Sequence, residues 1–220
     1  MIPADISRRP TLWLASGSPR RRALLEQAGF VIAGRAVPPR EVDETLRPGE
    51  PAERAAMRLA GEKLFAALDD PALPEGAVLL AADTLVISPE GEPMGKPVDA
   101  AEAVRMLSSL AGRGHRVITA VAVGDGKDVE EILASSTVHL VELDEATVRA
   151  YVETGEPLDK AGGYGIQGLA ACFVERVEGD CSAVVGLPLA ASRALLARFG
   201  VRPAWMDRGE KEYQREFSNE

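Results

Sequence analysis

The sequence predicts a single α/β domain over residues 11–200, and three observations support this fold class. The chain has 220 residues, of which 46% are hydrophobic, so it can bury one full core. Segments with helical spacing or helix caps separate several apolar runs, which is the alternation typical of α/β domains. We expect residues 1–10 to form an extension and residues 201–220 a polar tail. Apolar runs typical of buried strands lie at residues 11–15, 78–87 and 115–123.

The first unit of the chain is a strand, a turn and a helix. Residues 11–15 form the expected strand. Ser18 is a good N-cap and Pro19 suits the first helical position, so the helix begins there and ends near Gly29. A β-turn-α unit of this kind holds phosphates in many α/β proteins.

Three consecutive arginines, residues 20–22, lie in the first turn of this helix. Cations at the positive end of a helix dipole cost roughly a few tenths of a kcal/mol each, and a bound anion reverses the sign. Backbone N–H groups, a serine-rich turn and guanidinium groups together suit phosphate. A solvated basic turn is the alternative. The Ser18-Pro19 pair directly before the arginines favours the phosphate interpretation.

The next two elements contribute an acidic loop and a lysine. A second strand is expected at residues 30–33, before an irregular loop in which Glu44 can help to hold a cation, although most loop acids are simply solvated. Residues 51–68 predict a helix, and Lys63 falls on its apolar stripe four residues after Leu59. Such a lysine either extends to the rim, the commoner case, or points its ammonium at a bound phosphate.

Asp83 interrupts the apolar run at residues 78–87, which predicts a central strand buried on both faces. An unpaired carboxylate there would be costly, so Asp83 needs a hydrogen-bonded partner, a metal ion or a strand end that opens into a cleft. We favour a functional role over a structural one because buried acids are rare.

The middle of the chain predicts a turn, a helix and a hairpin. The turn at residues 91–97 presents Lys96, and the helix that follows ends near Leu110. Residues 115–123 and 131–143 are expected to pair as a hairpin whose second strand lies nearer an edge. The two histidines, His115 and His139, have no ligand partner at metal spacing and are interpreted as structural.

A glycine-rich loop at residues 156–168 is the second informative segment. Three of its glycines match the dinucleotide-binding spacing, but no strand precedes them and no helix follows. Dense glycines favour close approach of a ligand to the backbone, and the Gln167 amide suits recognition of a base edge. A strand at residues 169–177 and a last helix ending near Gly200 are expected after the loop.

Composition excludes several classes of protein. The chain carries 25 basic and 34 acidic residues, a net charge of −9, which argues against broad binding to nucleic acid or to anionic membranes. Cys172 and Cys181 suit neither a disulfide framework nor a zinc site and are interpreted as reduced thiols. The first apolar run is too short for an export signal, and no other run can span a bilayer. We therefore expect a cytoplasmic protein.

Six short segments form one further pattern, which covers roughly residues 11–200. They are Ser16-Gly17-Ser18-Pro19-Arg20-Arg21, Ala82-Asp83-Thr84, Gly95-Lys96-Pro97, His115-Arg116-Val117, Asp159-Lys160-Ala161-Gly162 with Ile166-Gln167-Gly168, and Val184-Val185-Gly186-Leu187-Pro188. In their residues and in their order along the chain, these segments closely resemble the motifs of the Maf family of nucleotide pyrophosphatases. The segment at residues 159–168 is similar to the branch that acts on dTTP and UTP, whereas the branch acting on 7-methyl-GTP differs there.

The resemblance implies a fold shared with inosine triphosphate pyrophosphatases: an elongated mixed β-sheet flanked by helices, with a cleft between two lobes. It also implies a nucleoside triphosphate substrate, a divalent cation (Mg²⁺ or Mn²⁺) and frequent homodimer formation. The residues that match the family's functional positions are Asp83, Lys63, Lys96 and Glu44 as catalytic groups, Asp83 and Glu44 also as metal ligands, and Ser16, Ser18, Arg20, Arg21 and Gln167 as substrate-binding groups.

We therefore predict hydrolysis of dTTP and UTP, with modified pyrimidine nucleotides as further substrates, to the monophosphate and pyrophosphate. The reaction would be metal-assisted attack of water on the α-phosphate. The alternatives are a nucleotide-binding regulator of septum formation in cell division and a pyrophosphatase for 7-methyl-GTP. Asp83 argues against pure binding, because a triphosphate site is easier to build without a carboxylate facing the anion.

Overall fold

The computed structural model describes residues 10–206 as one sheet with helices on both faces. Residues 1–9 of the predicted extension 1–10 and residues 207–220 of the predicted tail 201–220 lie outside the described residues. The elements, in chain order, are β1 (Thr11–Leu14), α1 (Pro19–Gln27), β2 (Ile32–Arg35), α2 (Ala52–Leu68), β3 (Ala77–Ile87), β4 (Pro93–Met94), α3 (Ala100–Leu110), β5 (Gly114–Gly124), β6 (Val129–Leu140), α4 (Glu145–Glu153), the 3₁₀ helices η2 (Glu156–Asp159), η3 (Ala161–Gly163) and η4 (Leu169–Phe173), β7 (Val174–Glu178), α5 (Cys181–Val185) and α6 (Leu189–Arg198).

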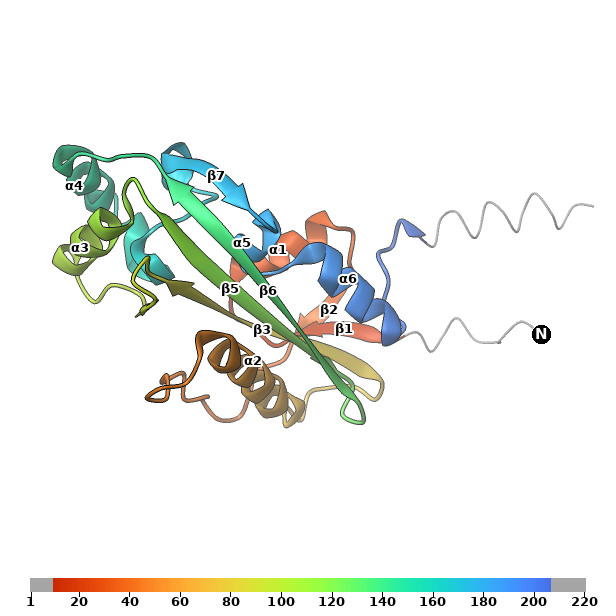
Figure 1. Cartoon of the computed structure of the whole chain (residues 1–220). Helices are drawn as coiled ribbons and strands as arrows, with labels where there is room; N and C mark the ends of the chain where they lie inside the picture. Colours follow the sequence, from red (N-terminus) through yellow and green to blue (C-terminus); the bar gives the residue numbers. More distant parts are fainter. Residues whose placement is uncertain (1–9, 207–220) are drawn as a thin grey trace, which may run out of the picture.

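The sheet is mixed, as predicted, and its strand order is β2-β1-β3-β5-β6-β7, with β4 paired to the end of β3. β1 runs parallel to β2 and to β3, and the other pairs are antiparallel. The long strands β3, β5 and β6 run along most of the molecule and make it elongated (Figure 1). The sheet and the flanking helices confirm the predicted fold class.

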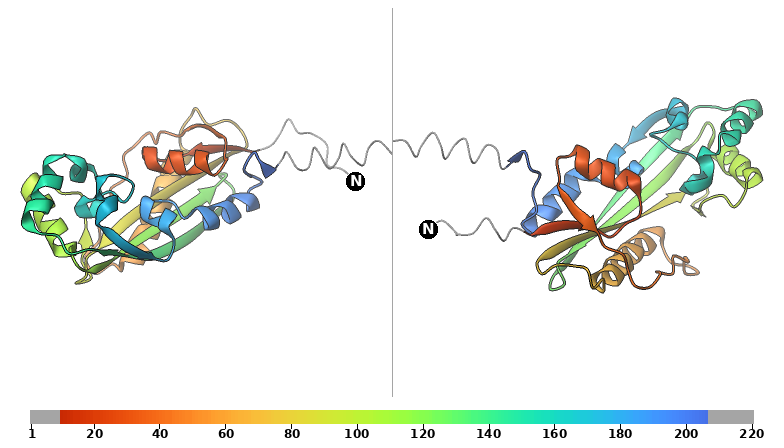
Figure 2. Two further views of the ribbon diagram at one scale, coloured as in Figure 1. Left: turned by 90° about the horizontal axis from the view of Figure 1, so that it is seen from above. Right: turned by 180° about the vertical axis from the view of Figure 1, so that it is seen from behind.

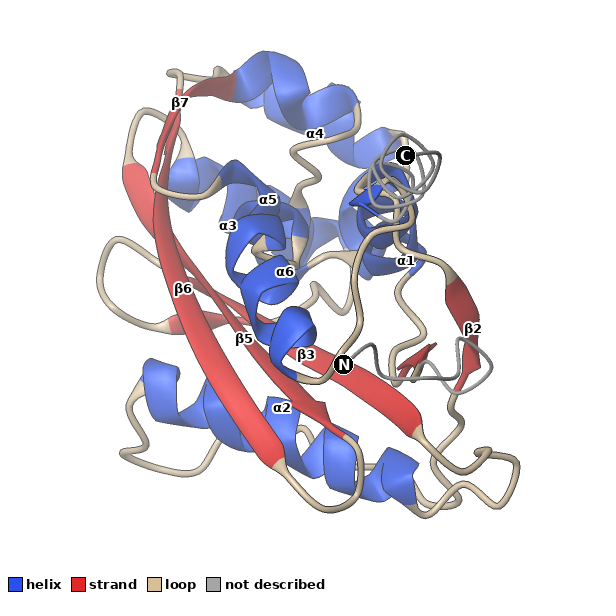
Figure 3. Cartoon of the chain, turned by 90° about the vertical axis from the view of Figure 1, so that its right-hand side faces the viewer, coloured by secondary structure: helices blue, strands red, loops and turns tan. Residues whose placement is uncertain are grey.

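Alternate residues of β3 face opposite helical layers. Leu79 and Ala81 pack in the core cluster that contains the buried residues of α2, whereas Leu80 and Ala82 pack with α1 and α6. Figure 3 shows α2 on one side of the sheet and α1, α5 and α6 on the other. Because side chains alternate along a strand, neighbouring residues of β3 reach different layers.

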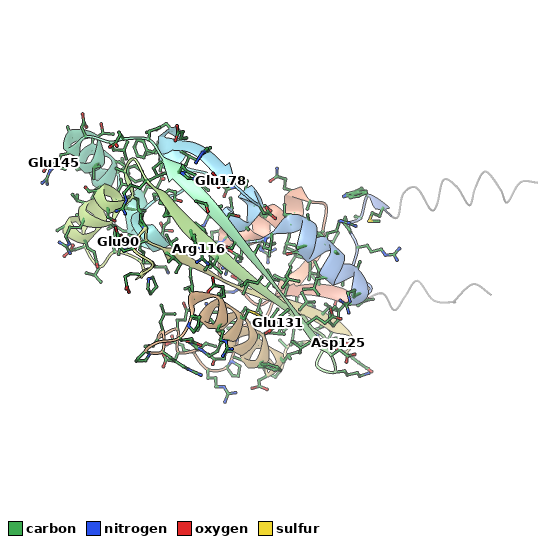
Figure 4. The ribbon with its side chains drawn as sticks, in the orientation of Figure 1. Glu90, Arg116, Asp125, Glu131, Glu145 and Glu178 are labelled. Carbon is green, nitrogen blue, oxygen red and sulfur yellow. The ribbon has the colours of Figure 1, made fainter. Side chains whose placement is uncertain are left out.

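Contacts with β5 and β6 hold α2 against the sheet. Arg116 of β5 forms an ion pair with Glu53 in the first turn of α2. The Glu131 carboxylate of β6 lies so close to Gly61 that a Cβ added there would be 2.8 Å from Oε1. Figure 4 labels Arg116 and Glu131 on these two strands. The position of α2 matters because it carries Lys63, a predicted site residue.

A second lobe lies at the far end of the long strands. There α3 and α4 share a core with the sheet, which includes Leu107, Val138, Tyr151 and Tyr164. Two further views show this lobe, in green and teal, at the opposite end from α1 and β1, in red (Figure 2). The two-lobed arrangement implied by the resemblance is confirmed.

Two predicted strands are displaced. The second strand covers residues 32–35 rather than 30–33, because Phe30 is buried in the core and its N–H donates to the Leu25 carbonyl. The strand predicted at residues 169–177 begins only at Val174. Residues 169–173 form a 3₁₀ helix, and the Leu169 N–H donates to the Glu156 carboxylate instead of to a neighbouring strand.

One further boundary differs from the prediction, and one helix was not predicted. β6 ends at Leu140 rather than at residue 143, and it is an edge strand only in its first part, because β7 pairs with it from Thr137 onward. The predicted last helix is α6, and a short helix that was not predicted, α5, precedes it. Gly186 adopts a φ of 123° and Pro188 follows it, so the chain turns between the two helices.

The chain beyond α6 packs against the end of α1. Val201 and Pro203 are buried, and Trp205 Nε1 donates to the Ala28 carbonyl at 3.0 Å. The packed structure therefore continues past residue 200. Cys172 and Cys181 are both exposed free thiols. Over residues 10–206, no helix combines the length and the hydropathy needed to cross a membrane.

Candidate functional site

A cleft opens where one edge of β3 has no strand beside it. β1 pairs with β3 as far as Leu14 and Leu80, and β4 pairs with it again from Val86. Asp83 and Thr84 lie between these points and line a cleft of about 1070 Å³, to which both lobes contribute. In open α/β sheets, ligands bind outside the carboxyl end of a strand where the chain connections diverge to opposite faces. The carboxyl end of β1 is such a point, since α1 and α2 cover opposite faces.

The turn between β1 and α1 forms one wall of the cleft. Ser18 caps α1 by accepting a hydrogen bond from the Arg21 N–H (3.5 Å), and Pro19 is the first helical residue, as predicted. The Ser16 hydroxyl accepts a hydrogen bond from the Ser18 N–H at 3.2 Å. The first turn of α1 contains no acidic residue. The turn therefore presents the positive end of a helix to the cleft, which favours an anion.

Arg21 ties this turn to two distant segments. Its Nε donates to the Gly186 carbonyl (2.9 Å), Nη2 to Thr84 Oγ1 (3.1 Å) and Nη1 to Ser16 Oγ (3.1 Å). Burial lowers the pKa of Arg21, and the nearby Asp83 carboxylate opposes this shift. A guanidinium has five N–H donors, so two remain for the oxygens of a ligand. Arg21 is thus suited both to brace the turn and to bind phosphate.

Lys63 joins two carboxylates at the opposite wall. Its Nζ lies 2.7 Å from Asp83 Oδ1 and 2.8 Å from Glu44 Oε1. The Asp83 side chain is 9% exposed and that of Lys63 18%, whereas that of Glu44 is 65% exposed. Asp83 faces α2 and Thr84 faces α1, because they are neighbours on β3. One strand thereby supplies a carboxylate to the lysine and a hydroxyl to Arg21.

One oxygen of the Asp83 carboxylate is not used by Lys63. This oxygen, Oδ2, is buried and makes no hydrogen bond among the described residues. Together with the Glu44 carboxylate, it offers hard oxygen donors of the type that Mg²⁺ and Mn²⁺ prefer. Over residues 10–206 there is no cluster of three or more His, Cys, Asp or Glu side chains that suits a metal ion. Mg²⁺ commonly takes one or two carboxylates and completes its shell with water and phosphate oxygens.

The second lobe supplies the remaining wall through η2 and the loop after η3. Gln167 is exposed and lines the cleft, as does Lys96 from the turn after β4. Asp159 reaches across to Arg20, with the Asp159 Oδ2 to Arg20 Nη1 distance at 3.5 Å. The second lobe therefore contributes both cations, such as Lys96, and the amide of Gln167 to the cleft.

Glu156 and Tyr151 hold the loop that carries Gln167. Tyr151 Oη donates to Glu156 Oε1 (2.9 Å) and accepts from the Gly165 N–H (3.2 Å), while Glu156 Oε2 accepts from the Leu169 N–H (2.9 Å). The carboxylate lies so close to Gly168 that an added Cβ would be 2.4 Å from Oε1. Both ends of the loop are fixed, and residue 168 has no room for a side chain.

Neither histidine lines the cleft. His115 is buried in the second lobe, where its Nε2 lies 2.7 Å from the hydroxyl of Tyr164, a cleft residue. Burial lowers the pKa of His115 to about 4, so its imidazole is neutral at pH 7. His139 lies beside Arg176 and Glu178 on the outer strands. Both positions agree with the structural interpretation.

His115 is expected to make the protein less stable in acid. Below pH 6.5, its ordinary pKa, the unfolded imidazole binds a proton, whereas the buried one does so only near pH 4. Between pH 7 and pH 4.5 the free energy of unfolding should therefore fall by roughly 2–3 kcal/mol more in the parent protein than in His115→Gln. Urea denaturation at the two pH values measures the difference. Equal slopes for His115→Gln and the parent would refute the assignment.

Comparison with known proteins agrees with this geometry. Residues 11–199 match the family model described as Maf-like protein. The chain belongs to the Maf-like family. Relatives named dTTP/UTP pyrophosphatase include those of Aromatoleum aromaticum, with 46% identity over 86% of this chain and 95% of the relative, and Anaeromyxobacter sp., with 47% identity over 88% and 92%. Another, from Escherichia coli O157:H7, has 44% identity over 86% of this chain and 93% of its own length.

In this Maf-like chain, every residue predicted for the site lines the one cleft. They are Ser16, Ser18, Arg20, Arg21, Glu44, Lys63, Asp83, Lys96 and Gln167. Their chemical roles stay predictions. The sequence analysis did not identify Arg35, which also lines the cleft. The strand prediction ended at residue 33, two residues too early, so it gave no reason to place Arg35 beside the carboxyl end of β1.

Proposed function

We propose that this chain hydrolyses dTTP and UTP to the nucleoside monophosphate and pyrophosphate, through attack of water on the α-phosphorus. Relatives that cover most of the chain carry the name dTTP/UTP pyrophosphatase. The observation that carries the proposal is the pairing of Asp83 and Glu44 through Lys63, across the cleft from the arginine turn. This arrangement would bring a general base and a phosphate-binding turn together at one site.

The phosphates would bind at the β1–α1 turn. The N-terminus of α1, the two remaining N–H donors of Arg21 and the guanidinium of Arg20 would bind the anionic oxygens there. Lys96 approaches from the other lobe. A protein with a net charge of −9 needs such local neutralisation to bind a triphosphate.

Asp83 would orient the attacking water and accept its proton at Oδ2. This oxygen is the buried one without a partner among the described residues, while Oδ1 is held by Lys63. Lys63 therefore fixes the carboxylate without blocking its second oxygen. Positioned general bases contribute about two to four powers of ten in rate.

A divalent cation would be held by Asp83 and Glu44. When bound, Mg²⁺ or Mn²⁺ supplies charge neutralisation and polarisation of the phosphate oxygens. Lys63 lies between the same two carboxylates and keeps them from repelling one another before the cation binds. Homodimer formation stays a prediction from the family resemblance.

Gln167 would recognise the base. Its amide is exposed toward the cleft on a loop whose two ends are fixed by Glu156 and Tyr151. A primary amide offers both a donor and an acceptor to a pyrimidine edge. The fixed loop limits how far the amide moves, which supports selectivity.

Product analysis on the full chain tests the proposal. The protein is incubated with Mg²⁺ or Mn²⁺ and dTTP, UTP, CTP, GTP or 7-methyl-GTP, and pyrophosphate is resolved from orthophosphate. We expect pyrophosphate, selectively from dTTP and UTP. Selectivity for 7-methyl-GTP would overturn the substrate assignment. Tight nucleotide binding without hydrolysis would overturn the reaction and favour a regulatory protein.

A further inference from the structure

The cleft has few cations available for a ligand. Among the described residues, six cationic and five acidic side chains line it, so their charges nearly cancel. A nucleoside triphosphate carries several negative charges, which must be balanced locally. The six cations are Arg20, Arg21, Arg35, Lys63, Lys96 and Lys160.

Four of these cations are already engaged. Arg20 and Lys160 both pair with Asp159, at 3.5 and 2.5 Å. Lys63 lies between two carboxylates, and Arg21 donates three hydrogen bonds within the protein. Within residues 10–206, only Arg35 and Lys96 of the six have neither an ion pair nor a side-chain hydrogen bond.

Arg35 lies over the turn that would bind the phosphates. It is the last residue of β2 and pairs in register with Leu14, the last residue of β1. Its guanidinium covers Gly17, where an added Cβ would be 3.1 Å from Arg35 Nη2 and 3.5 Å from Cζ. The side chain is exposed and lines the cleft. A free guanidinium therefore stands beside the N-terminus of α1.

We infer that Arg35 is a third arginine of the phosphate site and binds the phosphate tail of the substrate. The inference rests on the proposed function and deepens it, because it assigns a binding residue for the part of the substrate that leaves as pyrophosphate. The planar guanidinium matches phosphate oxygens through two parallel N–H bonds, which a lysine cannot reproduce. Arg21 holds the β1–α1 turn in place through its hydrogen bonds, and the exposed Arg35 guanidinium lies over the same turn.

Calorimetric binding of inorganic tripolyphosphate to the full chain tests the inference without requiring turnover. We expect Arg35→Gln to weaken binding about tenfold or more, since one charge-assisted bidentate contact is lost. Arg35→Lys should recover only part of the affinity. In dTTP hydrolysis, the Arg35→Gln variant should raise KM and weaken inhibition by pyrophosphate in parallel, with a smaller change in kcat.

Arg40→Gln is the matched control. Arg40 is an exposed arginine on the following loop, pairs with Asp69 at 3.5 Å and does not line the cleft, so the same charge change there should leave binding unaltered. Unchanged tripolyphosphate affinity in Arg35→Gln, or an equal loss in Arg40→Gln, would overturn the inference. If the parent protein binds tripolyphosphate in an Arg35-dependent way but releases no pyrophosphate from dTTP or UTP, the proposed function fails and the phosphate site stands.

Discussion

Asp83→Asn is expected to lower kcat for dTTP by about 10²- to 10⁴-fold while nucleotide binding is retained. The amide has nearly the shape of the carboxylate, so it can stay beside Lys63, but it cannot accept a proton from water. The buried Oδ2, which has no partner among the described residues, is the atom whose chemistry is lost. Initial-rate kinetics and calorimetric binding of dTTP to the same preparations separate the two effects.

Glu41→Gln is the control for this substitution. Glu41 is an exposed carboxylate at the edge of the same cleft, so the variant removes one negative charge without touching the Lys63 pair. Its kcat should stay within about twofold of the parent value, since solvent and salt screen an exposed charge. An Asp83→Asn variant with near-normal kcat would show that Asp83 is not the base. Equal losses in both variants would indicate a general charge effect.

Arg21→Ala should lower both stability and activity. The variant leaves the Gly186 carbonyl and the Ser16 and Thr84 hydroxyls without their donor, and hydrogen bonds to a charged group contribute about 1.5–3 kcal/mol each without being additive. We expect the free energy of unfolding to fall by about 3 kcal/mol. We also expect kcat/KM for dTTP to fall at least about 100-fold, because a phosphate contact and the fixed turn are both lost.

Arg22→Ala removes the next arginine of the same helix turn. Arg22 pairs with Glu26 on the surface at 3.3 Å, so its loss should cost less than about 1 kcal/mol. Urea denaturation and kcat/KM of the two variants, measured side by side, give the comparison. Similar small effects in both would mean that Arg21 does not connect the turn to β3 and to the α5–α6 connection.

Local signals made much of the site predictable. The Ser18 cap, Pro19 and the arginines predicted the turn and α1 because helix starts depend on neighbouring residues. Periodicity placed Lys63 on the inner face of α2, and the interrupted apolar run placed Asp83 in a buried strand. Each of these inferences depends only on the positions of residues within a single helix or strand.

Long-range contacts explain what the sequence analysis missed. Arg21 reaches the Gly186 carbonyl, 165 residues along the chain, and Thr84, 63 residues along, and no local pattern indicates such partners. The 3₁₀ helix that begins at Leu169 replaces part of a predicted strand because a tertiary hydrogen bond from the Leu169 N–H to the Glu156 carboxylate overrides the local apolar pattern. The contact of Arg35 with the Gly17 turn likewise depends on the pairing of β2 with β1.

Hydrolysis in ¹⁸O-labelled water tests the central claim most directly, because it locates the phosphorus that water attacks. The full chain is incubated with dTTP and Mg²⁺ in labelled water, and the products are analysed by mass spectrometry. Attack at the α-phosphorus, positioned by Asp83 beside the arginine turn, predicts one ¹⁸O atom in dTMP and none in pyrophosphate. Label in pyrophosphate, or release of labelled orthophosphate with dTDP, would contradict the account.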